Sequence, residues 1–292
     1  MLNYDGFRAL DAILRHQSFG SAARELSITQ SAVSQRLRQL EVQYGQRLLV
    51  RELPYRATGL GERLLSHLRQ VQLLEQTFQQ AVTERRELRP SFKICLNLDS
   101  LELWFQAVLE DPAIARSLRL DVSTDDEKFT LQHLKAGRVD LSIGSSGTAI
   151  PDHDRARLGG MSYVLVCAPE FKQRYFRSGL RRAALEETPA VVFNEKDDLH
   201  PEFLLRALRY SGRFPSTSVP SVRGFKSAIV SGFGYGVLPL VDIGAELRSG
   251  ALVHLQADRV LVRELFLHHW NYQSPAMKKL IASIQRAARA IR

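Results

Sequence analysis

Residues 18–37 read SFGSAARELSITQSAVSQRL, and this stretch predicts two short helices joined by a tight turn. Ala22 and Ala23 are small, so the first helix can pack closely on the second. Thr29 is suited to cap the second helix, and Gly45 is suited to end it in a left-handed conformation. The two expected helices cover residues 21–26 and 30–44. The stretch therefore predicts a helix-turn-helix.

The second helix has two chemically distinct faces. Val33, Leu37 and Leu40 share an inner, apolar face. The outer face carries short hydroxyls, an amide and a guanidinium, on Ser31, Ser34, Gln35 and Arg38. Such groups fit the base edges of the DNA major groove, but an ordinary solvated amphipathic helix would show the same pattern. The residues of this helix alone leave both interpretations open.

The flanking sequence extends a mostly helical head. Leu10, Ile13 and Leu14 predict an earlier helix. A short hairpin is expected over 48–55, and a long helix is expected from Thr58 to about Glu87. That helix carries a spaced apolar stripe at Leu64, Leu68, Val71, Phe78 and Val82.

Beyond Pro90, strand-like runs alternate with helical ones, which predicts an α/β domain with crossover connections. The expected strands are 92–98, 118–124, 139–144, 163–167, 190–193, 236–238 and 265–269. The glycines between Ser231 and Pro239 follow a helix and open a strand. A phosphate-binding loop has the opposite order, so this segment is interpreted as a structural turn.

Composition excludes several classes of protein. No apolar run is long enough for a transmembrane helix, and the first ten residues lack an export pattern, so a cytoplasmic protein with no membrane partner is expected. Cys95 and Cys167 are interpreted as buried, reduced thiols. No Cys/His spacing indicates a metal, no cofactor is expected, and the eight histidines form no catalytic set. The net charge of +9 suits a polyanionic partner or a merely solvated basic surface.

The head resembles the N-terminal domain of the LysR-type transcriptional regulators. The matching positions are Ala22-Ala23-x-x-Leu26, Thr29-Gln30-Ser31-Ala32-Val33-Ser34, Leu40-Glu41, Gly45, Leu48-Leu49-Val50-Arg51 and Thr58-x-x-Gly61. Many members have proline at Ser31, and many have the basic residue first at Gln35-Arg36. The resemblance implies a winged helix-turn-helix over 1–58, a linker helix over 59–90 and an effector domain over 91–292. This last domain would be a two-subdomain α/β unit of the periplasmic-binding-protein type, with subdomain I at about 91–163 and 267–292 and subdomain II at about 164–266.

The resemblance also implies roles for the residues of the head. The expected DNA contacts are Gln30, Ser31, Ser34, Gln35, Arg36 and Arg38 on the recognition helix, and Arg51 and Arg56 on the wing. The apolar stripe of the long helix would pair with a second copy to form a homodimer or homotetramer. Packing of that helix on its own effector domain is the alternative. The expected partners are double-stranded DNA, a small effector and RNA polymerase.

Within this family the chain resembles the basic-amino-acid-responsive subfamily, the ArgP/LysG or chromosome replication initiation inhibitor group. Matching positions include Leu68-Arg69-Gln70-Val71, Asp99-Ser100-Leu101 with Trp104, Asp126-Glu127, Asp197-Asp198-x-His200 and Leu265-Phe266-x-His268. The expected effector site consists of strand-end residues Asp99, Ser100, Asp125, Asp126, Glu127, Phe193 and Asn194. Helix capping is an equal alternative for Ser100 and Asp125. Asn194 departs from the aspartate of related sequences.

Together these patterns predict a sequence-specific transcriptional regulator that senses a basic amino acid, lysine or arginine, with amino-acid export or metabolism as its expected target. The alternatives are a nucleoid-type DNA-binding protein and a regulator of a different small molecule. An enzyme is disfavoured because no catalytic residue can be assigned. A solute-binding protein is disfavoured by the helical head and by the expected absence of an export signal.

Overall fold

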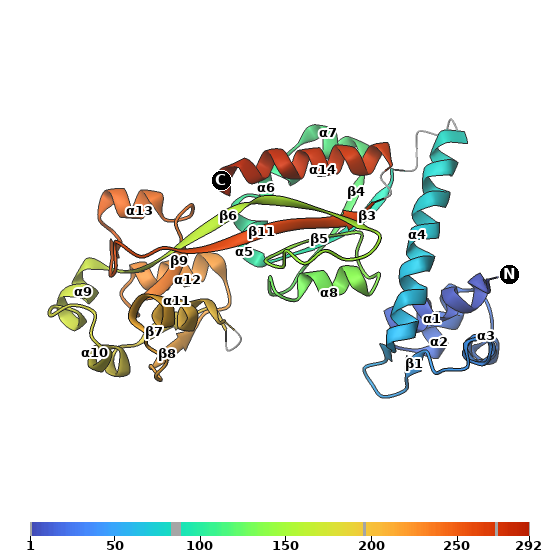
Figure 1. Ribbon diagram of the computed structural model, residues 1–292, viewed down its shortest axis with the longest axis horizontal. Helices are drawn as coiled ribbons and strands as arrows, with labels where there is room; N and C mark the ends of the chain where they lie inside the picture. Colours follow the sequence, from blue (N-terminus) through green and yellow to red (C-terminus); the bar gives the residue numbers. More distant parts are fainter. Residues whose placement is uncertain (1, 83–88, 195–196, 272–273, 292) are drawn as a thin grey trace.

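The computed structural model describes residues 2–82, 89–194, 197–271 and 274–291 of the chain (Figure 1). A small N-terminal domain and a long helix lie beside an elongated two-lobed domain. The elements of the N-terminal part are α1 (Tyr4–His16), α2 (Phe19–Glu25), α3 (Gln30–Tyr44), β1 (Leu49–Val50), β2 (Arg56–Ala57) and the long helix α4 (Gly59–Val82).

Local sequence sets the boundaries of these helices. The side chain of Ser18 accepts a hydrogen bond from the Ser21 amide and starts α2, two residues earlier than the sequence predicted. Thr29 accepts from the Ala32 amide at 3.2 Å and starts α3. Gly45 ends α3 with a φ of 66°, a left-handed conformation that suits glycine. The predicted start and end of α3 are confirmed.

The N-terminal domain has its own apolar core. Ala22 of α2, Val33 and Leu37 of α3, and Phe7 and Leu10 of α1 are fully buried together. Since the small alanine lets α2 approach α3 and α1 closely, the outer face of α3 is held at a defined angle on a rigid base.

The C-terminal domain is built on one seven-stranded mixed sheet. Its strands are β3 (Ser91–Leu96), β4 (Arg119–Thr124), β5 (Leu141–Gly144), β6 (His153–Cys167), β9 (Gly236–Pro239), β10 (Val253–His254) and β11 (Leu261–Trp270). Strand β3 is parallel to β4 and β5, whereas β6 is antiparallel to β9, β10 and β11. A separate parallel pair consists of β7 (Ala190–Val192) and β8 (Ser216–Ser218). The predicted α/β class is confirmed.

Helices cover this sheet in both lobes. They are α5 (Leu98–Leu103), α6 (Gln106–Leu109), α7 (Pro112–Ser117), α8 (Thr130–Lys135), α9 (Pro169–Tyr175), α10 (Arg182–Glu187), α11 (Leu199–Leu208), α12 (Val222–Val230), α13 (Gly244–Ser249), α14 (Pro275–Ala287) and the 3-10 turn η1 (Ala288–Ile291). We name the lobe with β3, β4, β5, α5–α8 and α14 subdomain I, and the lobe with α9–α13 and β7–β10 subdomain II.

Two long strands, β6 and β11, run through both lobes (Figure 1). The sequence predicted a strand only from Tyr163, but β6 begins ten residues earlier, at His153. The first five residues of β6 are mostly polar and none of them is buried, so they lack the apolar signal that marks its second half. Pairing with β11 from His153 to Tyr163 makes it a strand. The chain passes from one lobe to the other along β6 and returns along β11.

The glycine-rich turn before β9 is structural, as predicted. It follows α12 and leads into the strand at Gly236, where a Cβ would lie 2.5 Å from Ile229. Cys95 and Cys167 are both free and buried. Within the described ranges, no helix is long and apolar enough to cross a membrane.

Candidate functional site

The outer face of α3 presents a polar surface. Ser31, Gln35 and Arg38 are exposed, and Ser34 is half-buried beside them. Gln30 is exposed at the helix start. The structure therefore brings together five of the six side chains predicted on this helix, with their donors and acceptors turned away from the domain core.

Arg36 lies on a different side of α3. Its guanidinium pairs with Asp5 of α1 at 3.2 Å, and at 100° per residue it is about 140° around the helix from Ser31. Arg36 therefore does not share the outer face, because helical geometry turns it toward α1, and its contact with DNA stays a prediction.

The wing is attached to α3 by a small polar joint. Glu41 accepts a hydrogen bond from the Leu48 amide at 3.0 Å and also pairs with Arg51 at 3.5 Å. At Gly61 an added Cβ would lie 2.4 Å from the Leu48 carbonyl oxygen, so only glycine lets α4 approach the wing this closely. Arg51 and Arg56 remain exposed on the wing.

The apolar stripe of α4 is divided between two environments. Leu64 and Leu68 are 9% and 3% exposed and belong to the core of the N-terminal domain. Their assignment to a dimer seam is therefore wrong, since their surface is already buried within the chain. Val71 is half-buried, and Phe78 is 67% exposed. The side chain of Val82 lies outside the described residues.

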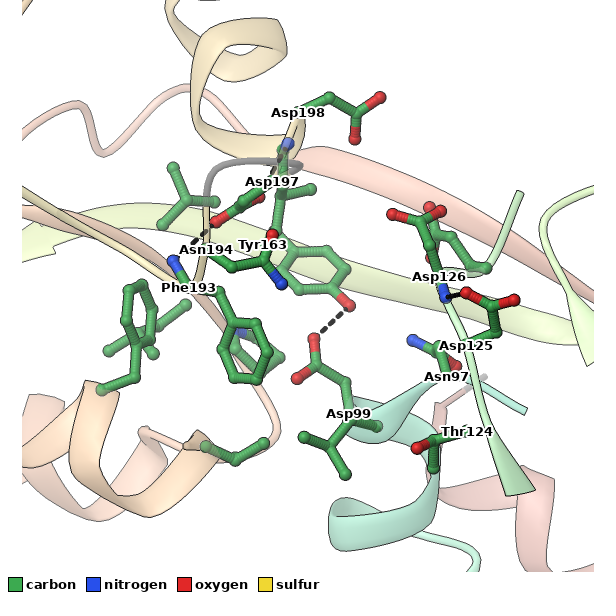
Figure 2. Close-up of a pocket in the computed structure, with 18 residues that line it drawn as sticks. Asn97, Asp99, Thr124, Asp125, Asp126, Tyr163, Phe193, Asn194, Asp197 and Asp198 are labelled. Atoms are coloured by element: carbon green, nitrogen blue, oxygen red, sulfur yellow. Dashed lines mark hydrogen bonds between the residues drawn. The ribbon is translucent and has the colours of Figure 1, made fainter. Parts of the chain in front are cut away.

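A cleft of about 360 Å³ opens between the two subdomains (Figure 2). Six carboxylic acids line it: Asp99, Asp125, Asp126, Glu127, Asp197 and Asp198. Among the lining residues that the structure describes, none is lysine, arginine or histidine. Phe193, Asn194 and Tyr163 add two aromatic rings and an amide. The lining has the character of a site for a small cationic molecule with some apolar surface.

Asp99 and Tyr163 face each other across the floor of the cleft. The Tyr163 hydroxyl donates a hydrogen bond to Asp99 Oδ2 at 2.8 Å (Figure 2). Burial raises the pKa of the Asp99 carboxyl to about 6, and the charges of Asp197 and Asp242 act in the same direction. An ammonium group placed beside Asp99 would offset that burial.

The three acids after β4 have different partners. Asp125 Oδ2 lies 2.6 Å from His133 Nε2, and its other oxygen accepts from the Asp126 amide. Glu127 pairs with Arg263 of β11 at 3.1 Å. Burial raises the pKa of the Glu127 carboxyl to about 7, and Arg263 opposes that rise only in part.

Ser100 does not line the cleft. It is fully buried on α5, and its hydroxyl has no hydrogen-bond partner among the described residues. The expectation that it meets a ligand is wrong because the turn of α5 points it into the protein. The capping alternative is wrong too, since Asn97 occupies the N-cap. Asn97 is 8% exposed, lines the cleft and leaves its buried Oδ1 without a partner among the described residues.

The opposite wall of the cleft comes from the segment after β7. The predicted Phe193 and Asn194 lie there, together with Asp197, which accepts hydrogen bonds from the Phe193 and Leu199 amides. Asp197 and Asp198 were not predicted as site residues. They lie in the connection from β7 to α11, so their place after a strand was the available signal.

Two family descriptions match this chain. Residues 4–62 match the bacterial regulatory helix-turn-helix protein, lysR family, and residues 115–289 match the LysR substrate binding domain. The HTH-type transcriptional regulator ArgP of Photobacterium profundum is 37% identical over 290 residues, which cover 99% of this chain and 97% of that relative.

Solved structures agree with the sequence comparison. The crystal structure of ArgP from Mycobacterium tuberculosis matches with a TM-score of 0.87 and 31% identity, covering 97% of this chain and 96% of that one. Full-length LysG from Corynebacterium glutamicum with bound effector Arg matches with a TM-score of 0.81 and 29% identity, covering 99% and 98%. The similarity therefore spans both the N-terminal head and the cleft-bearing domain.

Proposed function

This chain belongs to the LysR family of transcriptional regulators, and from that premise we propose that its cleft binds lysine or arginine and that this ligand sets how the head engages DNA. The chain is a DNA-binding regulator with an effector domain. We assign it no catalytic role.

The observation that carries the choice of ligand is the charge of the cleft. Six acids and no described basic residue line it, although the whole chain has a net charge of +9. An acidic site within a basic protein offers a cation local attraction that the overall charge would otherwise oppose. The bound arginine of the C. glutamicum relative supports the same ligand class.

The walls suggest a pose for the amino acid. Its α-ammonium would lie between Asp99 and Asp197, whose charges already influence each other. Its carboxylate would accept a hydrogen bond from the side-chain amide nitrogen of Asn97, which lines the cleft. The side-chain cation would then extend toward Asp126, on the β4 side of the cleft. Asn194 would contribute a neutral amide to the opposite wall.

A panel of ligands matched in shape tests the assignment. Lysine is compared with norleucine, and arginine with citrulline, because each pair differs mainly in the terminal charge. Lysine or arginine should raise the melting temperature of the full chain, since a ligand that binds only the folded state stabilises it. The neutral analogues should bind at least about tenfold more weakly. Equal binding of both members of a pair would overturn the choice of a cationic ligand.

The chain divides after residues 58 and 90 into the head, the linker helix and the effector domain. Within the effector domain, subdomain I covers about 91–163 and 267–292, and subdomain II covers about 164–266. The head would read bases with the outer face of α3 and bind the backbone through Arg51 and Arg56. Exposed side chains of α4, Leu74 and Phe78, would join two copies, so that two heads reach two half-sites.

A further inference from the structure

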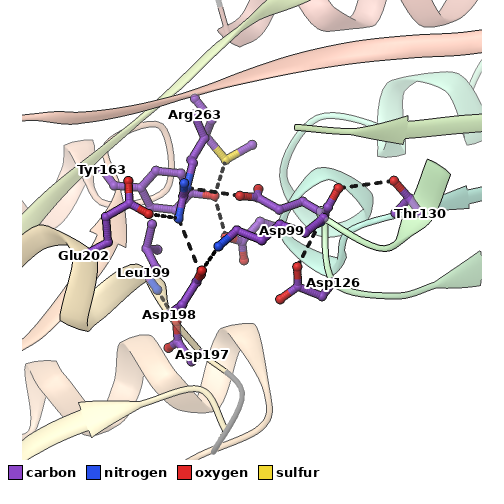
Figure 3. Close-up of polar contacts among 12 residues, drawn as sticks. Asp99, Asp126, Thr130, Tyr163, Asp197, Asp198, Leu199, Glu202 and Arg263 are labelled. Carbon is purple, nitrogen blue, oxygen red and sulfur yellow. Dashed lines mark hydrogen bonds and ion pairs between the residues drawn. The ribbon is translucent and has the colours of Figure 1, made fainter. Parts of the chain in front are cut away.

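Arg263 joins acids from both subdomains beside the cleft (Figure 3). Its Nε lies 3.1 Å from Glu127 of the β4–α8 connection, and its Nη2 lies 2.6 Å from Glu202 of α11. The same nitrogen lies 3.4 Å from Asp198, at the start of α11. The Arg263 and Glu127 side chains are only 12% and 13% exposed, so water screens their interaction weakly.

A second ion pair crosses between the subdomains at the same place. Lys128, which follows Glu127, pairs with Asp198. Subdomain I thus supplies one acid and one base, subdomain II supplies two acids, and the guanidinium of the crossing strand β11 lies between them. We name these five residues, Glu127, Lys128, Asp198, Glu202 and Arg263, the clasp.

The positive charge at the clasp is unevenly distributed. Its three carboxylates face Lys128 and Arg263, and a third cation, the largely exposed Arg206, pairs with Glu202 at 2.7 Å. Glu127 and Asp198 belong both to the clasp and to the cleft lining. Burial still raises the pKa of Glu127 despite the neighbouring guanidinium, so Arg263 does not fully compensate this carboxylate. A ligand cation near Glu127 would add to the partial compensation that Arg263 provides.

We propose that Arg263 is a positioning residue for the effector: by joining Glu127 to Glu202 it holds the two walls of the cleft at the spacing that a basic amino acid bridges. This inference rests on the proposed function for the identity of the ligand, but it makes its own statement about the ligand-free protein. Arg263 does not touch the ligand. Its effect is exerted through the wall residues Glu127 and Asp198.

The direction in which Arg263→Met changes ligand affinity separates a positioning role from a simple charge effect. Arg263→Met removes a cation near an acidic cleft, so a purely electrostatic role predicts tighter binding of lysine or arginine. A positioning role predicts weaker binding, by about tenfold or more, because the walls lose the Arg263 link and keep only the more exposed Lys128–Asp198 pair. Arg263→Lys keeps the charge but loses the forked geometry, and should bind with intermediate affinity. Glu264→Gln is the control. Glu264 follows Arg263 on β11 and forms a surface pair with Arg157 of β6, and this variant should bind the ligand as wild type does.

Hydrogen exchange of the ligand-free full chain provides the second readout. Arg263→Met should speed exchange in both the β4–α8 connection and the start of α11, whereas Glu264→Gln should not. Unchanged exchange in these segments, or tighter ligand binding by Arg263→Met, would overturn the positioning role. If the wild type binds neither lysine nor arginine but Arg263→Met still speeds exchange in both segments, the proposed ligand is wrong. The link that Arg263 makes between the two walls is then still supported.

Discussion

Arg69 of the long helix α4 binds Asp140 of subdomain I through two parallel hydrogen bonds of 2.7 and 2.6 Å. Asp140 is fully buried and also accepts a hydrogen bond from the Lys93 amide at 2.8 Å. The helix that carries the head is therefore attached to the effector domain of the same chain.

Breaking this ion pair should destabilise the protein strongly. Asp140→Asn leaves the Arg69 guanidinium poorly compensated at 15% side-chain exposure, which should lower the free energy of unfolding by about 3 kcal/mol. Urea unfolding measures the loss. Arg286→Met, which removes the exposed pair with Asp111, is the control and should cost less than about 1 kcal/mol. Equal losses in the two variants would contradict a special role for the Arg69 pair.

Gly137 determines how closely α4 approaches subdomain I. Its φ is +66°, and an added Cβ would lie 2.7 Å from the Ser66 Cα of α4. Gly137→Ala should therefore displace α4 and weaken the effector response of DNA binding. Gly250→Ala has a similar φ of +77° but no atom within 4 Å of the added Cβ, so it reports backbone strain alone, about 1 kcal/mol. Gly137→Ala should exceed that cost in thermal unfolding, and matching costs would count against the contact.

Substitutions on α3 and on the wing should affect DNA binding in different ways, because we expect α3 to contact bases and the wing to contact the backbone. Arg38→Ala, on the outer face of α3, should cost about 1–3 kcal/mol on the cognate site and relax sequence preference. Arg56→Ala, on the wing, should weaken all sequences alike and reduce the salt slope by about 1. Titration against cognate and scrambled duplexes at several salt concentrations measures both. Wild-type affinity and salt slope in both variants would show that this face does not bind DNA.

Dimerisation should depend on the exposed part of the α4 stripe. Phe78→Glu places a charge where we expect the partner helix, so it should yield monomers in light scattering and lose binding to paired half-sites. Glu75→Gln, a neighbouring exposed position, should remain dimeric. Leu68→Ala should instead lower the stability of the N-terminal domain by about 3 kcal/mol, because Leu68 lies in its core. A dimeric Phe78→Glu variant would place the interface elsewhere.

Ligand affinity should rise with pH. Burial raises the pKa of Asp99 from 3.8 to about 6 and that of Glu127 from 4.5 to about 7. In the ligand-free protein these raised values favour folding at low pH, and that stability is lost as the pH rises through about 6 to 7. Asp99 faces Tyr163, Asp197 and Asp242, and Glu127 faces Arg263, Lys128 and Asp126.

A cationic ligand favours the ionised carboxyls of Asp99 and Glu127. Its binding should therefore release protons in the pH range around their raised pKa values of about 6 and about 7. Affinity for lysine should increase by up to about tenfold per pH unit for each group below its pKa. Calorimetry at about pH 5 and about pH 8, in buffers of different ionisation enthalpy, measures affinity and proton release together. Affinity that falls with rising pH would contradict ionisation of these acids on binding.

The sequence by itself determined the features that depend on neighbours along the chain. The caps at Thr29 and Gly45 and the inner face of α3 follow from side-chain preferences and the helical period, and the structure confirms them. Seven strands after Pro90 were likewise predicted from local apolar patterns, whereas the short β8 and β10 were not. Six of the seven residues predicted from strand ends, among them Asp99, Phe193 and Asn194, line the cleft, because strand ends meet at one edge of a sheet.

Only the tertiary structure decided which side of each element is covered, and by what. Leu64 and Leu68 fit a dimer seam by spacing, but the N-terminal domain buries them. Ser100 follows a strand as the cleft acids do, yet the turn of α5 directs it inward. Arg263 lies far along the chain from Glu127 and Glu202, and it meets them because β11 crosses between the subdomains. Periodicity specifies the faces of an element, whereas long-range packing selects the residues that meet across the cleft.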